Sequence, residues 1–230
     1  NGFEVEIAAH DVMGGEQHES LKQKTDKIYD WWLFMKKLLA LILFCLSFFC
    51  GSAQIMTAEQ VLESVLEWSS RYDAELNTVL SSDKEKALKI FSIDRGGNKP
   101  RKDIAKWNEV RAYISYFYDE LRQAEGESVE IPADDQKAIL TKYLTVYDPC
   151  HNKDEWFSAI KGMCEEVGFC PDVKAYKADP AGYKGHVGDV SSVIRVAVTG
   201  RKNTPDLCAI MSVLGRDKVI ERINEYLERI

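Results

Sequence analysis

From Met56 to the C-terminus, the sequence repeats one pattern, a helix-capping signal followed by apolar residues three or four positions apart. Thr57-Ala-Glu-Gln60 predicts a capping box, in which the two side chains satisfy exposed backbone amides. Asn152-Lys-Asp-Glu155 predicts another cap of the same kind. No stretch alternates apolar and polar residues for long enough to predict a strand. The sequence therefore predicts an all-α fold.

Two helical lobes are predicted, because residues 124–134 are polar and contain glycine and proline, which is typical of a linker. In the first lobe, residues 54–125, Ser82-Asp-Lys-Glu85 predicts a further helix start. A single long helix is then expected from Lys102 to Arg122. Its predicted inward stripe consists of Ile104, Trp107, Ile114, Phe117, Tyr118 and Leu121.

The second lobe is predicted over residues 130–230. Its helices are expected over 134–147, after Asn152, after Asp189, after Thr204 and over 217–230. Residues 170–188 hold two prolines and three glycines and are predicted to form a long loop. At Thr204-Pro205-Asp206, Thr204 is expected to cap the helix and Pro205 to occupy its first position.

Residues 1–53 differ from the rest of the chain. Leu38 to Cys50 is apolar except for Ser47, two lysines precede it, and small residues follow it. This arrangement is typical of a secretory signal peptide, and it is shorter than the roughly 20 residues of a membrane-spanning helix. The segment is left unassigned between a targeting or anchoring sequence over 35–53, an extra apolar helix, and misjoined sequence.

The composition fits a soluble protein, with 45% hydrophobic and 29% charged residues. The net charge of −7 argues against a general nucleic-acid coat but is compatible with a local basic face. Six cysteines without a C-x-x-C pair indicate reduced thiols in the cytoplasm. No metal site is predicted, because the spacing of Cys150, His151, Cys164, Cys170 and His186 matches no standard zinc motif. Since the chain does not begin with methionine, we expect it to be a fragment.

Residues 189–215 read DVSSVIRVAVTGRKNTPDLCAIMSVLG. This segment resembles the C-terminal anticodon-binding region of bacterial glutamyl-tRNA synthetases, where R-V-A-x-T-G is followed by S/T-P and a helix ending in L-G. Three further blocks resemble a Firmicutes-type subgroup, namely Lys174–Asp189, Asn98–Trp107 and Met56–Gln60. The resemblance covers about residues 54–230 and implies a two-lobed, helical anticodon-binding domain, a bundle or cage of helices.

The resemblance implies a class I glutamate–tRNA ligase, a cytoplasmic enzyme that attaches glutamate to tRNA(Glu) using ATP and Mg²⁺. The chain contains neither the H-I-G-H nor the K-M-S-K-S motif of the family's nucleotide-binding domain. We therefore expect no catalytic residue and no bound cofactor in this chain, which would depend on the missing catalytic domain of the same enzyme. The resemblance implies neither a DNA partner nor a membrane partner, and it leaves recognition of tRNA(Gln) open.

Two basic stretches are the predicted places of RNA contact. Single-stranded RNA loops present phosphates, which cations bind, and splayed bases, on which planar side chains stack. Six cations stand against two acids between Arg95 and Arg111, and a second excess follows from Lys174 to Lys202. Such charge runs are also typical of solvated faces. With the resemblance, the candidate tRNA-binding residues are Arg95, Arg101, Lys102, Arg195, Arg201, Thr204, Pro205 and Leu207.

Arg195 lies within an otherwise apolar helical stretch. Its fork of donors suits recognition of a base edge, and in the resembled family the arginine of the R-V-A motif lies at the anticodon. The alternative is an ion pair with Asp189, Glu221 or Glu225.

Two rival hypotheses remain at this point. One is a non-enzymatic helical protein, exported or membrane-tethered by residues 35–53, with a recruited synthetase-like domain. The other is a degraded or misjoined gene product without a selected function.

Overall fold

The computed structural model describes residues 31–32, 35, 56–95, 104–122 and 126–230. Met56–Ile230 forms a compact unit of its own. Of the segment before it, Trp31, Trp32 and Met35 are helical, and the apolar run 38–50 lies outside the described residues. Within the described part of the chain, no helix is long and apolar enough to cross a membrane.

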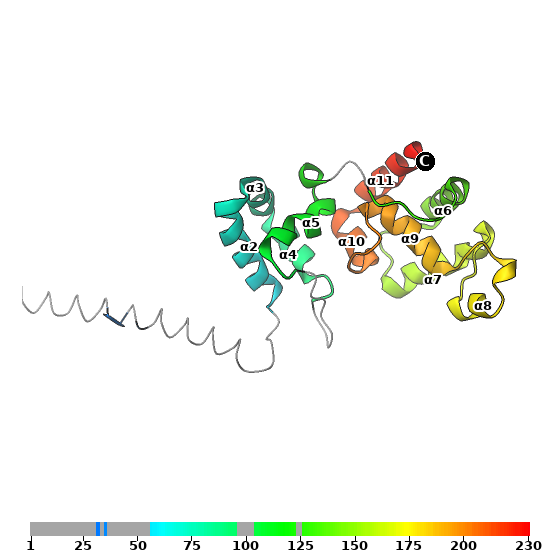
Figure 1. Ribbon diagram of the computed structural model, residues 1–230, viewed down its shortest axis with the longest axis horizontal. Coiled ribbons are helices and arrows are strands. Elements are labelled where there is room, and N and C mark those ends of the chain that lie inside the picture. Colours follow the sequence, from blue (N-terminus) through cyan, green and yellow to red (C-terminus); the bar gives the residue numbers. More distant parts are fainter. Residues whose placement is uncertain (1–30, 33–34, 36–55, 96–103, 123–125) are drawn as a thin grey trace, which may run out of the picture. The chain divides into compact units, whose positions relative to one another are not determined.

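Short helices make up the first part of the unit, in cyan to green in Figure 1. In chain order they are α2 (Ala58–Tyr72), α3 (Ala74–Ser82), α4 (Lys84–Ser92), η1 (Trp107–Glu109), α5 (Val110–Ile114), η2 (Ser115–Phe117) and η3 (Asp119–Leu121). The predicted capping box before α2 is confirmed. The Gln60 amide donates to the Thr57 hydroxyl at 3.3 Å, and the Thr57 amide donates to the Gln60 side chain at 2.9 Å.

The cap predicted at Ser82 is wrong by one residue. Helix α3 continues through Ser82, whose hydroxyl donates to the Val79 carbonyl at 2.8 Å. The chain turns at Asp83 instead, and the Asp83 carboxylate caps α4 by accepting from the Lys86 amide at 2.8 Å. Both residue types are good caps, so the sequence alone did not choose between them.

The single long helix predicted from Lys102 to Arg122 is also wrong. In the described residues of that stretch, α5 is flanked by 3₁₀ turns. The Tyr116 and Phe117 carbonyls accept hydrogen bonds from the side chains of Arg222 and Lys86. An α-helix would direct these carbonyls to backbone amides, so contacts from distant residues override the helical periodicity here.

The second part of the unit, in green to red in Figure 1, begins after the predicted linker. Its elements are α6 (Ala133–Val146), α7 (Lys153–Cys164), η4 (Glu165–Val167), α8 (Val173–Ala178), η5 (Pro180–Gly182), α9 (Val187–Thr199), α10 (Leu207–Leu214) and α11 (Arg216–Arg229). The predictions over 134–147 and 217–230 are confirmed to within one residue at each end. Gly200 ends α9 with a φ of 73°, a left-handed conformation that favours glycine.

Three predicted features of this part are corrected. Residues 170–188 contain α8, which Asp172 caps, and are therefore not one loop. Helix α9 begins after His186, and Asp189 closes its capping box by accepting from the His186 amide at 2.8 Å. Helix α10 is capped by Asp206, which accepts from the Ala209 amide at 2.9 Å, so Thr204 is not its cap.

The all-α prediction is confirmed. The described residues contain no strand, and their one β-bridge is an isolated parallel pair between Cys170 and His186.

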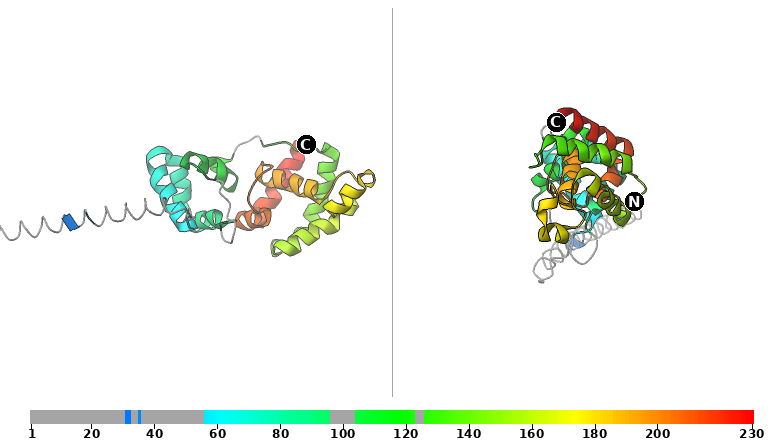
Figure 2. Two further views of the ribbon diagram at one scale, coloured as in Figure 1. Left: turned by 60° about the horizontal axis from the view of Figure 1, so that its bottom comes forward. Right: turned by 90° about the vertical axis from the view of Figure 1, so that its right-hand side faces the viewer.

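Buried apolar residues form two clusters within Met56–Ile230. One is built by α2, α3, α4 and the segment 110–121, and the other by α6, α7, α9, α10 and α11. Helix α10 joins them, because its Ile210 belongs to the first cluster and its Met211 to the second. In Figure 1 and in the left view of Figure 2, α10 accordingly lies between the two sets of helices. We propose that the clusters are the cores of the two predicted lobes, here called the first lobe (56–122) and the second lobe (126–230).

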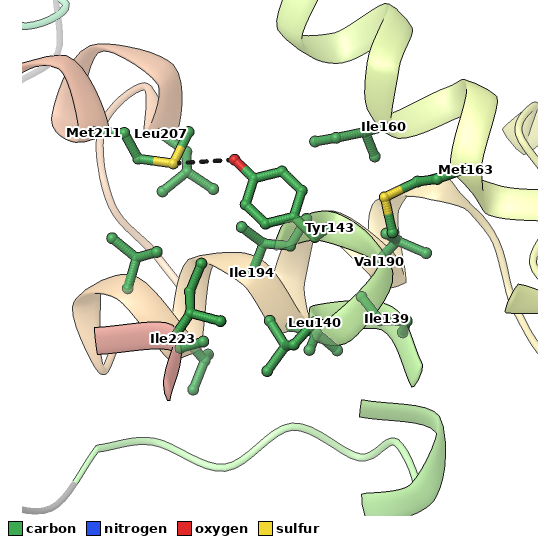
Figure 3. Packing of buried hydrophobic residues seen from close by; sticks show 14 of the residues in the cluster. Ile139, Leu140, Tyr143, Ile160, Met163, Val190, Ile194, Leu207, Met211 and Ile223 are labelled. Atoms are coloured by element: carbon green, nitrogen blue, oxygen red, sulfur yellow. Dashed lines mark hydrogen bonds between the residues drawn. The ribbon is translucent and has the colours of Figure 1, made fainter. Parts of the chain in front are cut away.

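The core of the second lobe contains hydrogen-bonded polar groups. The Tyr143 hydroxyl is directed at the Met211 sulfur at 3.3 Å, and it accepts from the Trp156 ring nitrogen at 2.9 Å. Figure 3 shows Tyr143 from α6 reaching α10 among apolar side chains. Because buried polar groups are costly without partners, these bonds fix the position of α10 against α6 and α7.

Candidate nucleic-acid interface

Arg195 of α9 holds the turn that leads into α10. Its Nη1 donates to the Thr204 hydroxyl, to the Pro205 carbonyl at 2.9 Å and to the Thr204 carbonyl at 3.4 Å. Hydrogen bonds from a charged donor are about twice as strong as neutral ones, so this contact fixes the turn firmly. The acids considered as alternative partners engage other groups. Glu225 pairs with Arg122 at 2.7 Å and Glu221 with Lys218 at 2.8 Å, while Asp189 accepts from the His186 amide.

The same turn is also held from the first lobe. Asp94, with a φ of 53°, accepts a hydrogen bond from the Asp206 amide at 2.8 Å. The Asp206 carboxylate pairs with Lys153 at 2.6 Å. Burial acts to raise the pKa of Asp206, but the hydrogen bonds from Lys153 and from the Ala209 amide outweigh it and leave this pKa below its ordinary value. The turn is therefore fixed from both sides and presents a rigid surface.

A pocket of about 250 Å³ lies beside this turn, and it is called the tyrosine pocket here. It is lined by Glu109, Ala112, Tyr113 and Tyr116 of the first lobe and by Arg201, Asn203, Thr204 and Pro205 of the second. It is smaller than the roughly 300–1,000 Å³ of sites that enclose drug-sized ligands, so it suits a single planar ring. Tyr116 is buried, but the Tyr113 ring is partly exposed and can stack on such a group, while a guanidinium and a carboxamide offer hydrogen bonds.

The sequence of this region is similar to that of known proteins. Residues 177–227 match the anticodon binding domain family. This range contains most of the helices that support the turn 204–206. The chain is 41% identical over 177 residues to the glutamate–tRNA ligase of Clostridium perfringens (strain SM101 / Type A), covering 75% of this chain and 32% of that protein. The corresponding ligase of Sorangium cellulosum is 39% identical over 175 residues, covering 75% and 31%. That of Acetivibrio thermocellus is 38% identical over 171 residues, covering 74% and 31%.

The chain carries an anticodon-binding region of the glutamate–tRNA ligase family. The similarity covers its C-terminal three quarters. The chain spans about a third of the length of the curated relatives it matches.

Within this anticodon-binding region, four of the predicted site residues lie together. Arg201, Thr204 and Pro205 line the tyrosine pocket, and Arg195 bonds to the last two. Leu207 follows them in the chain, but its side chain is only 2% exposed and packs in the core of the second lobe.

The three candidates from the first lobe lie differently. Arg95 donates to the Phe91 carbonyl at 2.8 Å and to the Met56 carbonyl at 3.3 Å, and it does not line the tyrosine pocket. These bonds connect the end of α4 to the residue before α2. Arg101 and Lys102 lie outside the described residues, so their part in RNA contact stays a prediction.

Sequence reasoning missed Tyr113, Asn203 and Asp94. Asn203 could have been found, because it lies between the second basic stretch and the predicted turn. Tyr113 gave no signal, because a long helix would have placed it off the inward stripe. Asp94 lies two residues before a pair of glycines, and aspartate is one of the residue types that tolerate the left-handed conformation. In the described residues, no group of three or more His, Cys, Asp or Glu side chains is placed to hold a metal ion.

Proposed function

We propose that Met56–Ile230 binds tRNA through the anticodon loop, and that the tyrosine pocket receives one unstacked base. The observation that carries this proposal is the turn 204–206, which Arg195 and Asp94 hold in place against the pocket. Recognition of single-stranded RNA needs such a preformed surface, because an ordered loop does not lose further conformational entropy when the RNA binds.

Each residue of the proposed site has a distinct role. Tyr113 stacks on the base, Asn203 bonds to its edge, and Arg201 supplies positive charge. Thr204 and Pro205 form one wall of the pocket, and Arg195 acts by holding that wall. Leu207 anchors α10 in the core, while Arg95, Arg101 and Lys102 are proposed as additional contacts from the first lobe.

We further propose that the longer protein attaches glutamate to tRNA(Glu) in the cytoplasm. ATP and Mg²⁺ would be handled by a catalytic domain of the same enzyme, because the two motifs of the family's nucleotide-binding domain do not occur in this chain. This region would then hold the anticodon, while the catalytic domain carries out the ligase reaction.

Filter binding with the full chain tests the RNA proposal. We expect tRNA(Glu) to bind at least about tenfold more tightly than the same transcript with a changed anticodon, which corresponds to about 1.4 kcal/mol. Equal binding of both transcripts would contradict anticodon recognition. A tRNA(Gln) transcript in the same assay decides whether that tRNA is also recognised.

A variant of the stacking residue sharpens the test. Tyr113→Ala should weaken tRNA(Glu) binding by about tenfold, because stacking of one base on an aromatic ring contributes about 1–3 kcal/mol. Tyr72→Ala is the matched control, since Tyr72 is 71% exposed at the end of α2 and does not line the pocket. The same loss in both variants would show that the effect does not come from the tyrosine pocket.

A further inference from the structure

A second, smaller pocket adjoins the tyrosine pocket and is called the arginine pocket here. Its volume is about 30 Å³, and both Tyr116 and Arg201 line the two pockets jointly. Arg122 and Arg229 also line it, and none of its lining residues is acidic. The pocket is too small for a base, and its surface is mostly polar.

Two glycines bring the backbone close on one side of this pocket. The Glu127 amide donates to the Gly200 carbonyl at 2.8 Å. A Cβ atom on Gly126 would lie 2.9 Å from the Gly200 Cα, closer than real Cβ contacts allow. Any other residue at Gly126 would therefore push the linker away from α9 and open the pocket.

The three guanidinium groups come from different elements. Arg122 pairs with Glu225 at 2.7 Å, and Arg201 donates to the Ser115 hydroxyl at 3.4 Å. Arg229 lies over the Tyr226 ring, with 4.9 Å between the guanidinium carbon and the ring centre. A guanidinium carries five N–H donors, so these contacts leave Arg122 and Arg201 able to donate to a further oxygen. Glu225 offsets one of the three positive charges.

We propose that the arginine pocket binds a backbone phosphate of the RNA whose base occupies the tyrosine pocket. This inference rests on the proposed function. Arginine matches phosphate oxygens with paired, charge-assisted hydrogen bonds, and a phosphate needs little enclosed volume when its ester oxygens point to solvent. Because Arg201 lines both pockets, the phosphate and the base belong to the same nucleotide or to adjacent ones.

The salt dependence of binding tests this assignment, because each phosphate contact to a single strand contributes about −0.7 to the slope of log K against log salt. Arg229→Gln should make the slope shallower by about 0.7. The affinity advantage of the wild type should then shrink about 2.6-fold between about 50 and 200 mM salt. Arg229→Lys keeps the charge and should keep the slope.

Arg216→Gln is the matched control. Arg216 is exposed at the opposite end of the same helix, 13 residues away, which corresponds to about 20 Å along α11. Its loss should leave the slope unchanged. Arg122→Gln serves as a second test variant, and circular dichroism should show that every variant remains helical.

The outcomes separate the two proposals. An unchanged slope in both Arg229→Gln and Arg122→Gln overturns the phosphate assignment, even where the wild type still discriminates between anticodons. A shallower slope without anticodon discrimination keeps the phosphate assignment and removes the proposed base recognition. Binding of inorganic phosphate alone is measured by calorimetry. If Arg229→Gln abolishes this binding but leaves the salt slope of RNA binding unchanged, the pocket binds free phosphate, and the proposal that it binds an RNA phosphate is overturned.

Discussion

Residues 201–206 and residues 107–116 line the same tyrosine pocket, but they are held in place in different ways. The first segment is a turn between α9 and α10, anchored mainly by Arg195 of the helix directly before it. The second is an irregular succession of short helices, and its end is held by Arg222, more than a hundred residues further along the chain. The turn therefore depends first on the helix before it, with further support from Asp94 and Lys153. The end of the other wall depends on Arg222 of the second lobe.

Because of this difference, substitutions that remove contacts between the two lobes should lower the stability of the fold most. Arg222 donates to the Tyr116 carbonyl of the first lobe and to the Val198 carbonyl of the second at 3.1 Å, and it pairs with Asp119 at 3.2 Å. Its side chain is fully buried. We expect the contacts of Arg222 to be worth more than any contact within one lobe.

Replacing Arg222 with methionine should give the largest effect. Arg222→Met should lower the free energy of unfolding by about 3 kcal/mol, because two buried carbonyls lose their donor at about 1–3 kcal/mol each. Urea unfolding measures this change. The control Arg216→Met, at an exposed position on the same helix, should stay within about 0.5 kcal/mol. A similar small change for Arg222→Met would show that the first-lobe wall does not depend on the second lobe.

Arg195→Met should have the next largest effect, about 2 kcal/mol in unfolding free energy, because a charged donor to three acceptors of the turn is lost. Thr204→Val removes only the hydroxyl acceptor and should cost about 1 kcal/mol. The order of the two values is the informative result. A larger loss in Thr204→Val would mean that the hydroxyl, and not the arginine, fixes the turn.

The helix start at residue 83 offers a test with an expected effect of about 1 kcal/mol. Asp83→Ala should cost that amount in thermal or urea unfolding, since an N-cap side chain contributes about 0.5–2 kcal/mol. Ser82→Ala should cost less than about 0.5 kcal/mol, because Ser82 is the last residue of α3. Equal costs would place the helix boundary one residue earlier.

The smallest expected effect concerns pH. The hydrogen bond from Arg111 lowers the pKa of Asp73 below its ordinary value of 3.8, and the two side chains lie 2.8 Å apart. A lowered carboxyl pKa stabilises the fold above the unfolded-state value, and this stability is lost as the pH falls through the folded-state value. The stability difference between wild type and Arg111→Met should therefore shrink from about pH 5 to about pH 3.

The amount involved should be below about 1 kcal/mol, because Arg111 is partly exposed and solvent screens the pair. Arg71→Met, which removes an exposed pair with Glu67 on α2, serves as the control and should show no such trend. A difference that grows toward acid pH would contradict the assigned role of Arg111.

Much of the fold could be predicted from the sequence, because its signals are local. The capping boxes at Thr57 and Asn152 and the glycine after α9 place helix ends through bonds within a few residues. The choice between neighbouring caps, as at Ser82 and Asp83, could not be predicted, because it depends on where the previous helix ends. Resemblance in the segment around Arg195 predicted the turn of the site, though not the way in which Arg195 supports it.

The amino-acid sequence by itself determined the helical class, several helix ends and the segment that carries the second-lobe side of the site. Only the tertiary structure decided the side of the site that the first lobe contributes. Arg222, which is buried, and Lys86, which is half-buried, donate hydrogen bonds to the carbonyls of Tyr116 and Phe117, where periodicity predicts a continuous helix. Contacts between residues far apart in the chain can override a weak local preference, because a buried polar or charged group such as Arg222 is costly without hydrogen-bond partners.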